Sequence, residues 1–167
     1  MSKVYFASDH AGFALKQALI EHVRTLGYEV EDIGASTLDP DDDYPDFITP
    51  CAKHVAEENE RGGSAAARGI IIGGSGQGEA MAANRIPGIR AAVFYGSRPV
   101  THSLDIEGGH SEDGYDVVRL PRRHNDANVL SIGARFVSGD EADEAVRIFL
   151  ETPFSDSPRH TRRLAKF

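Results

Sequence analysis

The stretch Gly69-Ile70-Ile71-Ile72-Gly73-Gly74-Ser75-Gly76-Gln77-Gly78-Glu79 decides how this chain folds. Its apolar part is a short run typical of a buried parallel strand. A glycine-rich turn follows, and Ala80-Met81-Ala82-Ala83-Asn84 then has the composition of a helix. A turn between a strand and a helix N-terminus leaves backbone N–H groups unpaired, and the helix dipole favours an anion there. The stretch therefore predicts an anion cradle at the end of a strand.

Ser75 adds a hydroxyl to this cradle, and Glu79 adds a carboxylate that can act as a base. The alternative is a tight connection without a ligand, in which Glu79 only balances the helix dipole. Two known phosphate loops do not fit. The dinucleotide pattern GxGxxG, counted from Gly74, needs glycine where Glu79 stands, and a Walker loop needs Lys and then Ser or Thr after Gly78.

Length and composition predict one soluble globular domain over residues 1–167, with 40% hydrophobic and 26% charged residues. No apolar run approaches the roughly 20 residues of a membrane span, and the N-terminus lacks a signal-peptide pattern. The single cysteine, Cys51, fits a reducing cytosol and is expected to be buried core. A net charge of −8 disfavours a broad nucleic-acid surface. We therefore expect a cytoplasmic protein with neither nucleic acid nor membrane as a partner.

Strand and helix patterns alternate along the chain. Apolar runs and alternation predict strands at residues 4–7, 28–33, 69–72, 89–95 and 128–133. Helical periodicity, glycine stops and a capping box predict helices at residues 13–26, 48–60, 80–84 and 138–151. This order implies right-handed βαβ units, and hence an α/β fold with a mostly parallel sheet covered on both faces.

Ligands in such sheets bind at the carboxyl ends of the strands. Asp9-His10 and the 73–79 turn both follow strands, so they should share that edge. We expect His124 and Asn125 to join them, because the set then supplies acid, base and hydrogen-bonding groups around one site. Taken singly, each histidine is more simply explained as a capping or surface residue.

The segment Ser97–Pro121 is expected to be irregular. It contains His102 and His110, whose spacing among carboxylates is a weak metal signal, and a solvated loop is the simpler explanation. The C-terminal segment, residues 158–167, is basic in an acidic chain. If it is helical, Arg159 and Arg163 lie on one face, where their guanidinium groups suit phosphate oxygens. A solvated tail is the alternative, and the segment could also reach a second subunit.

Taken together, these motifs make the chain resemble the type B ribose-5-phosphate isomerase family, which includes galactose-6-phosphate and allose-6-phosphate isomerases. The resemblance runs from end to end of the sequence. It rests on these stretches: Ser8-Asp9-His10-Ala11-Gly12-Phe13, Asp43-Tyr44-Pro45-Asp46, Gly73–Glu79, Ala82–Arg90, His124–Leu130, Gly133-Ala134-Arg135 and Arg159–Arg163.

The resemblance implies a Rossmann-like three-layer sandwich with a five-stranded parallel sheet, no metal or organic cofactor, and a homodimer whose active sites lie at the subunit interface. It implies that Asp9 and His10 hold the sugar and its phosphate, and that His124 assists ring opening. The remaining substrate contacts that it implies are Tyr44, Gly74, Ser75, Gly76, Gln77, Gly78 and Asn125, with Arg135, Arg159 and Arg163 on the phosphate.

The family has two subgroups that differ in the catalytic base, a cysteine just before the glycine-rich loop or a glutamate further on. Gly73 occupies the cysteine position here, so the resemblance assigns the base to Glu79, with Ser75 assisting. The expected reaction interconverts ribose 5-phosphate and ribulose 5-phosphate through an enediolate. A tetrose or hexose phosphate is the alternative substrate, because Ser97–Pro121 is longer than the family's usual connection. A non-catalytic phospho-sugar-binding module is the alternative function.

Overall fold

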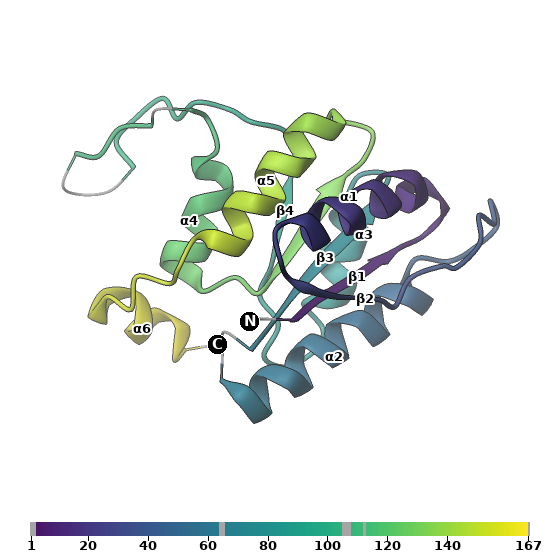
Figure 1. Ribbon diagram of the computed structural model, residues 1–167. Helices are drawn as coiled ribbons and strands as arrows, with labels where there is room; N and C mark the ends of the chain where they lie inside the picture. Colours follow the sequence, from purple (N-terminus) through teal and green to yellow (C-terminus); the bar gives the residue numbers. More distant parts are fainter. Residues whose placement is uncertain (1–2, 64–65, 105–107, 112, 167) are drawn as a thin grey trace.

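The computed structural model describes residues 3–63, 66–104, 108–111 and 113–166, and its strands form one parallel sheet (Figure 1). The strand order is β2-β1-β3-β5-β4. The strands are β1 (Lys3–Ser8), β2 (Glu29–Asp32), β3 (Ala67–Gly73), β4 (Ala91–Phe94) and β5 (Val129–Gly133). The predicted α/β fold with a five-stranded parallel sheet is therefore confirmed.

Helices cover both faces of the sheet (Figure 1). The helices are α1 (Phe13–Thr25), α2 (Pro45–Gly62), α3 (Gln77–Ala83), α4 (Asp116–Asn125), α5 (Gly139–Glu151) and α6 (Pro158–Leu164), with a 3-10 turn η1 (His10–Gly12). Neighbouring residues of β3 point to opposite layers. Ile70 and Ile72 pack with residues of α1 and α5, whereas Ile71 packs with residues of α2. Every residue of β3 is buried, which explains its apolar run Ile70-Ile71-Ile72; Arg68, near the start of the strand, donates to the Ala67 carbonyl at 2.9 Å.

The segment Ser97–Pro121 is less irregular than expected, because α4 begins inside it at Asp116. Its many polar residues and the interior Pro121 weaken the helical signal in the sequence. The helix forms because packing against the rest of the protein stabilises it: Val118 and Arg122 are almost fully buried. Residues 105–107 and 112 of the segment lie outside the described part of the chain.

Before α4 the chain forms a loop that leaves the sheet and runs past that helix (Figure 1). Its ends meet where the Arg98 N–H donates to the Gly114 carbonyl at 2.8 Å. His102 and His110 are exposed on this loop, as expected if the segment is a solvated loop.

Other boundaries shift by a few residues. Helix α2 begins at Pro45 rather than Ile48, because proline is tolerated in the first turn of a helix. Helix α3 begins at Gln77, which places Glu79 in its first turn. Cys51 is fully buried, as predicted. None of the helices in the described ranges is long and apolar enough to cross a membrane.

A buried ion pair ties α1 to the end of β2. The Lys16 side chain is completely buried, and its ammonium donates to the two carboxylate oxygens of Asp32 at 2.8 and 2.6 Å. It also donates to the Ala35 carbonyl at 2.8 Å. This contact fixes the start of the long connection from β2 to α2.

We predict that Asp32→Ala lowers the free energy of unfolding by about 3 kcal/mol, because it leaves the buried Lys16 charge without its partner. Urea unfolding of the full chain measures the change. Glu29→Ala is the matched control, since Glu29 lies on the same strand and pairs only at the surface. Equal losses for the two variants would contradict this role of the pair.

Candidate active site

The carboxyl ends of three neighbouring strands build one edge of the sheet. Ser8 is in register with Ile72, and Gly73 with Gly133, so β1, β3 and β5 end side by side. The predicted site residues that follow these strands are therefore brought together. They are Asp9, His10, Gly74, Ser75, Gly76, Gln77, Gly78, Glu79 and Arg135.

Glu79 is the buried acid of this edge, with only 4% of its surface exposed. Its carboxylate lies directly over the Cα of Gly73, where an added Cβ would be 1.7 Å from Oε1. Burial raises the pKa of Glu79 above its ordinary value, and the negative charge of Asp9 raises it further, whereas a backbone hydrogen bond opposes the shift. A buried carboxylate with a raised pKa is suited to proton transfer.

The glycine loop is held in a conformation that only glycine adopts easily. Gly76 has φ 73°, and a Cβ there would lie 3.0 Å from the Ile132 carbonyl carbon. The Ser131 hydroxyl, on β5, donates to the Gly76 carbonyl at 2.6 Å and fixes the turn to that strand. Ser75 is exposed, and its hydroxyl oxygen accepts from the Gln77 N–H at 3.3 Å.

Two side chains flank the loop, one on either side. The aromatic ring of Tyr44 lies against Gly78, since a Cβ at Gly78 would be 2.8 Å from it. The Arg135 guanidinium lies against Gly74. The backbone N–H of Arg135 also donates to the Gly74 carbonyl, at 3.3 Å. The loop therefore presents its backbone between an aromatic ring and a cation, which is a suitable environment for an anionic ligand.

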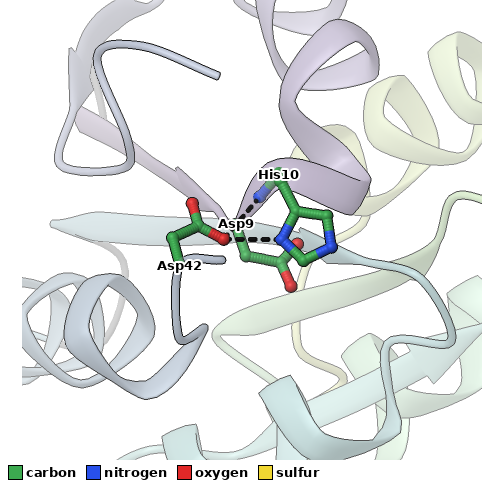
Figure 2. Close-up of side chains that lie close together, drawn as sticks. All are labelled: Asp9, His10 and Asp42. Atoms are coloured by element: carbon green, nitrogen blue, oxygen red, sulfur yellow. Dashed lines mark hydrogen bonds and ion pairs between the residues drawn. The ribbon is translucent and has the colours of Figure 1, made fainter. Parts of the chain in front are cut away.

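Asp9 and His10 lie at the end of β1, and a third residue joins them (Figure 2). The Asp9 carboxylate caps η1 by accepting from the Ala11 N–H at 3.0 Å. The His10 ring nitrogen Nδ1 is 2.6 Å from Oδ1 of Asp42. Asp42 is not among the site residues that the sequence predicts. Its pairing with His10 joins residues 32 positions apart, so no local pattern could reveal it.

These three side chains offer ligand atoms within 4.8 Å of one another, a spacing that could hold a metal ion. In the observed arrangement the atoms already bind each other or backbone N–H groups. The cluster therefore serves as a hydrogen-bonded unit of the site.

His124 and Asn125 do not share this edge, so the prediction that one edge carries all the polar groups is wrong. They end α4, just before β5 begins, and so lie at the amino ends of the strands. β5 is five residues long, which at about 3.3 Å per residue separates the two edges by roughly 13 Å. The direction of a crossover helix, running against the strands, causes this separation.

The predicted arginines of the C-terminal segment lie with His124 rather than with Glu79. The segment is helical, as α6, and both Arg159 and Arg163 are exposed on it. The ring of His160, between them, stands 4.2 Å from the ring of His124. His124, Asn125 and the two arginines therefore form a second group, remote from the glycine loop within one chain.

Asp126 holds this second group in place. It ends α4 with φ 45°, and its carboxylate accepts from Arg122 at 2.9 Å and from Arg90 at 2.8 Å. Arg90 also donates to the Asn125 carbonyl at 3.0 Å. Two arginines from different elements thus fix the turn that carries His124 and Asn125.

Comparison with known proteins agrees with this architecture. The sequence pattern of the family described as Ribose/Galactose Isomerase matches residues 4–105 and 110–167. Ribose-5-phosphate isomerase B of Mycolicibacterium paratuberculosis is 37% identical over 162 residues, covering 97% of this chain and 87% of that protein.

Solved structures give the same result. The crystal structure of ribose-5-phosphate isomerase B from Mycoplasma genitalium with bound ribulose-5-phosphate superposes with a TM-score of 0.81 at 34% identity, covering 98% of this chain and 92% of the other. The type B enzyme of Trypanosoma brucei gives 0.80 at 33% identity, covering 99% and 96%. The fold, the glycine loop and the sequence likeness over nearly the whole chain together show that this protein belongs to the ribose/galactose isomerase family.

Proposed function

We propose that this protein interconverts ribose 5-phosphate and ribulose 5-phosphate, with Glu79 as the base. The observation that carries the proposal is the buried Glu79 carboxylate, whose pKa is raised, at the end of a glycine-rich loop in which Ser75 and Gln77 are exposed. The relatives described above are ribose-5-phosphate isomerases of type B, one of them solved with ribulose-5-phosphate.

The proposed reaction moves two protons within the sugar, one from C2 to C1 and one from the O2 hydroxyl to O1. Glu79 removes the proton from C2 of the open-chain aldose and returns it at C1 of the ketose, so no oxidant or reductant is needed. The intermediate enediolate carries negative charge on oxygen, which donors already in place stabilise. The proposed donors are the Ser75 hydroxyl and the loop's backbone N–H groups from Gly74 to Gly78, except that of Gln77, which already donates to Ser75. The Arg135 cation suits the phosphate, whose binding positions the carbon skeleton.

The second group of residues reaches the reaction only if two copies of the chain combine. His124, Asn125, Arg159 and Arg163 lie at the opposite edge from Glu79, so we infer that they complete the site of a partner subunit. Exposed apolar side chains support a homodimer: Met81 is 65% exposed, Tyr95 40% and Phe136 59%. In that arrangement His124 of one protomer assists ring opening at the Glu79 of the other.

The position of Glu79 explains why this chain has glycine at residue 73. The carboxylate fills the space that a side chain at Gly73 would need, so a cysteine base there and a glutamate base at Glu79 exclude each other. A binding module that only held a phospho-sugar would have no use for this arrangement. A tetrose or hexose phosphate remains the alternative substrate, since the loop preceding α4 adds surface beside the helix that carries His124.

We predict that Glu79→Gln lowers kcat for ribose 5-phosphate by about 10²–10⁴-fold and abolishes solvent deuterium incorporation, because the base is lost. In the unchanged enzyme, kcat/KM should fall as the pH drops through the raised pKa of Glu79, since the protonated acid cannot accept a proton. A coupled ribulose assay and mass spectrometry measure both effects. Glu57→Gln, on an exposed part of α2, is the control and should change neither. Unchanged exchange in Glu79→Gln would refute the assignment of the base.

We predict that mixed dimers of two inactive variants recover activity. A hybrid of Glu79→Gln and His124→Asn subunits keeps one site with both native groups, so random pairing should restore about a quarter of the native rate. The variants carry different affinity tags and are refolded together before assay. A mixture of Glu79→Gln with Glu79→Ala contains no intact site and serves as the control. Recovery no greater than in that control would contradict a shared site.

We predict that Gly73→Ala inactivates the enzyme while the chain stays folded. The new methyl group must displace the Glu79 carboxylate, at an expected cost of about 1–3 kcal/mol in the free energy of unfolding. The pKa of Glu79, followed by carboxyl NMR, should drop toward its ordinary value as the side chain leaves its buried position. Gly139→Ala is the control, because a Cβ there meets no atom within 4 Å. Native activity in Gly73→Ala would show that the close approach is unimportant.

A further inference from the structure

His10 is held by a carboxylate from a distant part of the chain (Figure 2). Oδ1 of Asp42 accepts the His10 backbone N–H at 3.0 Å and lies 2.6 Å from the ring nitrogen Nδ1. Asp42 belongs to the turn before α2, whereas His10 begins η1 after β1. One oxygen therefore fixes both the backbone and the ring of His10.

Asp42 is almost completely withdrawn from water, with 8% of its side chain exposed, whereas 34% of the His10 side chain is exposed. Within the described residues the hydrogen bonds of its side chain go to His10 alone, and its second oxygen, Oδ2, is buried without a partner there. Burying a carboxylate costs free energy unless charge or hydrogen bonds offset it. A positively charged His10 ring would provide that compensation.

We propose that Asp42 is a positioning residue that keeps the His10 imidazole positively charged and turns its Nε2–H toward the phosphate of the substrate. The inference rests on the proposed function, because it names how that site binds its ligand. Figure 2 shows Nε2 on the side of the ring that points away from Asp42. An ionised carboxylate has no hydrogen, so at 2.6 Å Nδ1 must carry one. The proton on the opposite nitrogen is then available to the ligand.

Several neighbouring groups shift the pKa of His10 in opposite directions, and the hydrogen bond to Asp42 has the largest effect. The hydrogen bond to Asp42 raises the pKa of His10, partial burial lowers it, the Asp9 carboxylate raises it, and the Arg135 cation lowers it. The net direction is upward. His10 and Arg135 are thus two cations at one edge of the sheet, an arrangement that suits a doubly charged anion such as a phosphate monoester.

Asp9 does not position the His10 ring as Asp42 does. Its carboxylate oxygen Oδ1 is occupied by the N–H groups of Ala11 and Gly12, at 3.0 and 3.4 Å. Asp9 instead lies near Glu79, whose pKa it raises. The two acids therefore have separate roles, Asp42 toward the phosphate-binding histidine and Asp9 toward η1 and the base.

The test compares Asp42→Asn with Asp41→Asn, two variants that remove the same charge from the same turn. Asp42→Asn keeps an oxygen that can accept from the His10 backbone and from Nδ1–H, so the fold should remain intact. Asp41 is exposed and serves as the matched control. Calorimetry measures the binding of inorganic phosphate to the full-length variants from about pH 6 to about pH 8, and NMR follows the His10 ring.

We predict that the pKa of His10 falls in Asp42→Asn and not in Asp41→Asn. Phosphate affinity depends on the protonated ring, so it is present below the His10 pKa and lost as the pH rises through it. In Asp42→Asn that loss should occur at lower pH, with affinity about tenfold weaker than in the control above neutrality. Comparison with Asp41→Asn at each pH cancels the titration of phosphate itself. In activity assays, KM should rise more than kcat falls.

Equal His10 titrations and equal phosphate affinities in the two variants would overturn the inference, and Asp42 would then only anchor the turn. A loss of affinity that is the same at every pH would overturn it as well, because charge would not be the cause. Phosphate binding is measured without turnover. A protein that shows the predicted binding but no isomerisation of ribose 5-phosphate would refute the proposed function and retain the role of Asp42.

Discussion

The complete burial of β3 is the constraint on which the rest of the structure depends. A strand covered on both faces favours apolar residues, as Ile70-Ile71-Ile72 shows, and its parallel neighbours must return through crossover helices. The ends of β1, β3 and β5 then meet at one edge, where the chain turns sharply to enter η1, α3 and the turn after Gly133. The glycine loop, Asp9 and Arg135 are neighbours for this reason alone.

The same constraint divides the functional groups. Crossover helices run against the strands, so the end of α4 is carried to the opposite edge together with His124. Helix α6 then packs beside α4, which keeps Arg159 and Arg163 with His124. A sheet of this kind cannot bring the two groups together within one chain. A second copy could, and this topology is the reason for the homodimer proposed above.

Close contacts decide the chemistry of the first edge. Glu79 lies where a side chain at Gly73 would lie, so its carboxylate is buried and its pKa raised. Asp42 is buried against His10, which raises the pKa of that imidazole in turn. One acid thus becomes a better proton acceptor near neutrality, and one histidine a more persistent cation. Both effects arise from contacts between residues that the sequence spaces widely or places across a turn.

The sequence by itself determined the α/β class, the parallel sheet and the glycine loop with Glu79, because strand burial and turn chemistry are local properties. It did not predict α4, since Pro121 and many polar residues weaken the helical pattern, and the burial of Val118 and Arg122 stabilises the helix. Only the tertiary structure placed His124 at the far edge and paired His10 with Asp42. Both depend on the direction in which elements pack, and contacts between distant residues leave no periodic pattern along the chain.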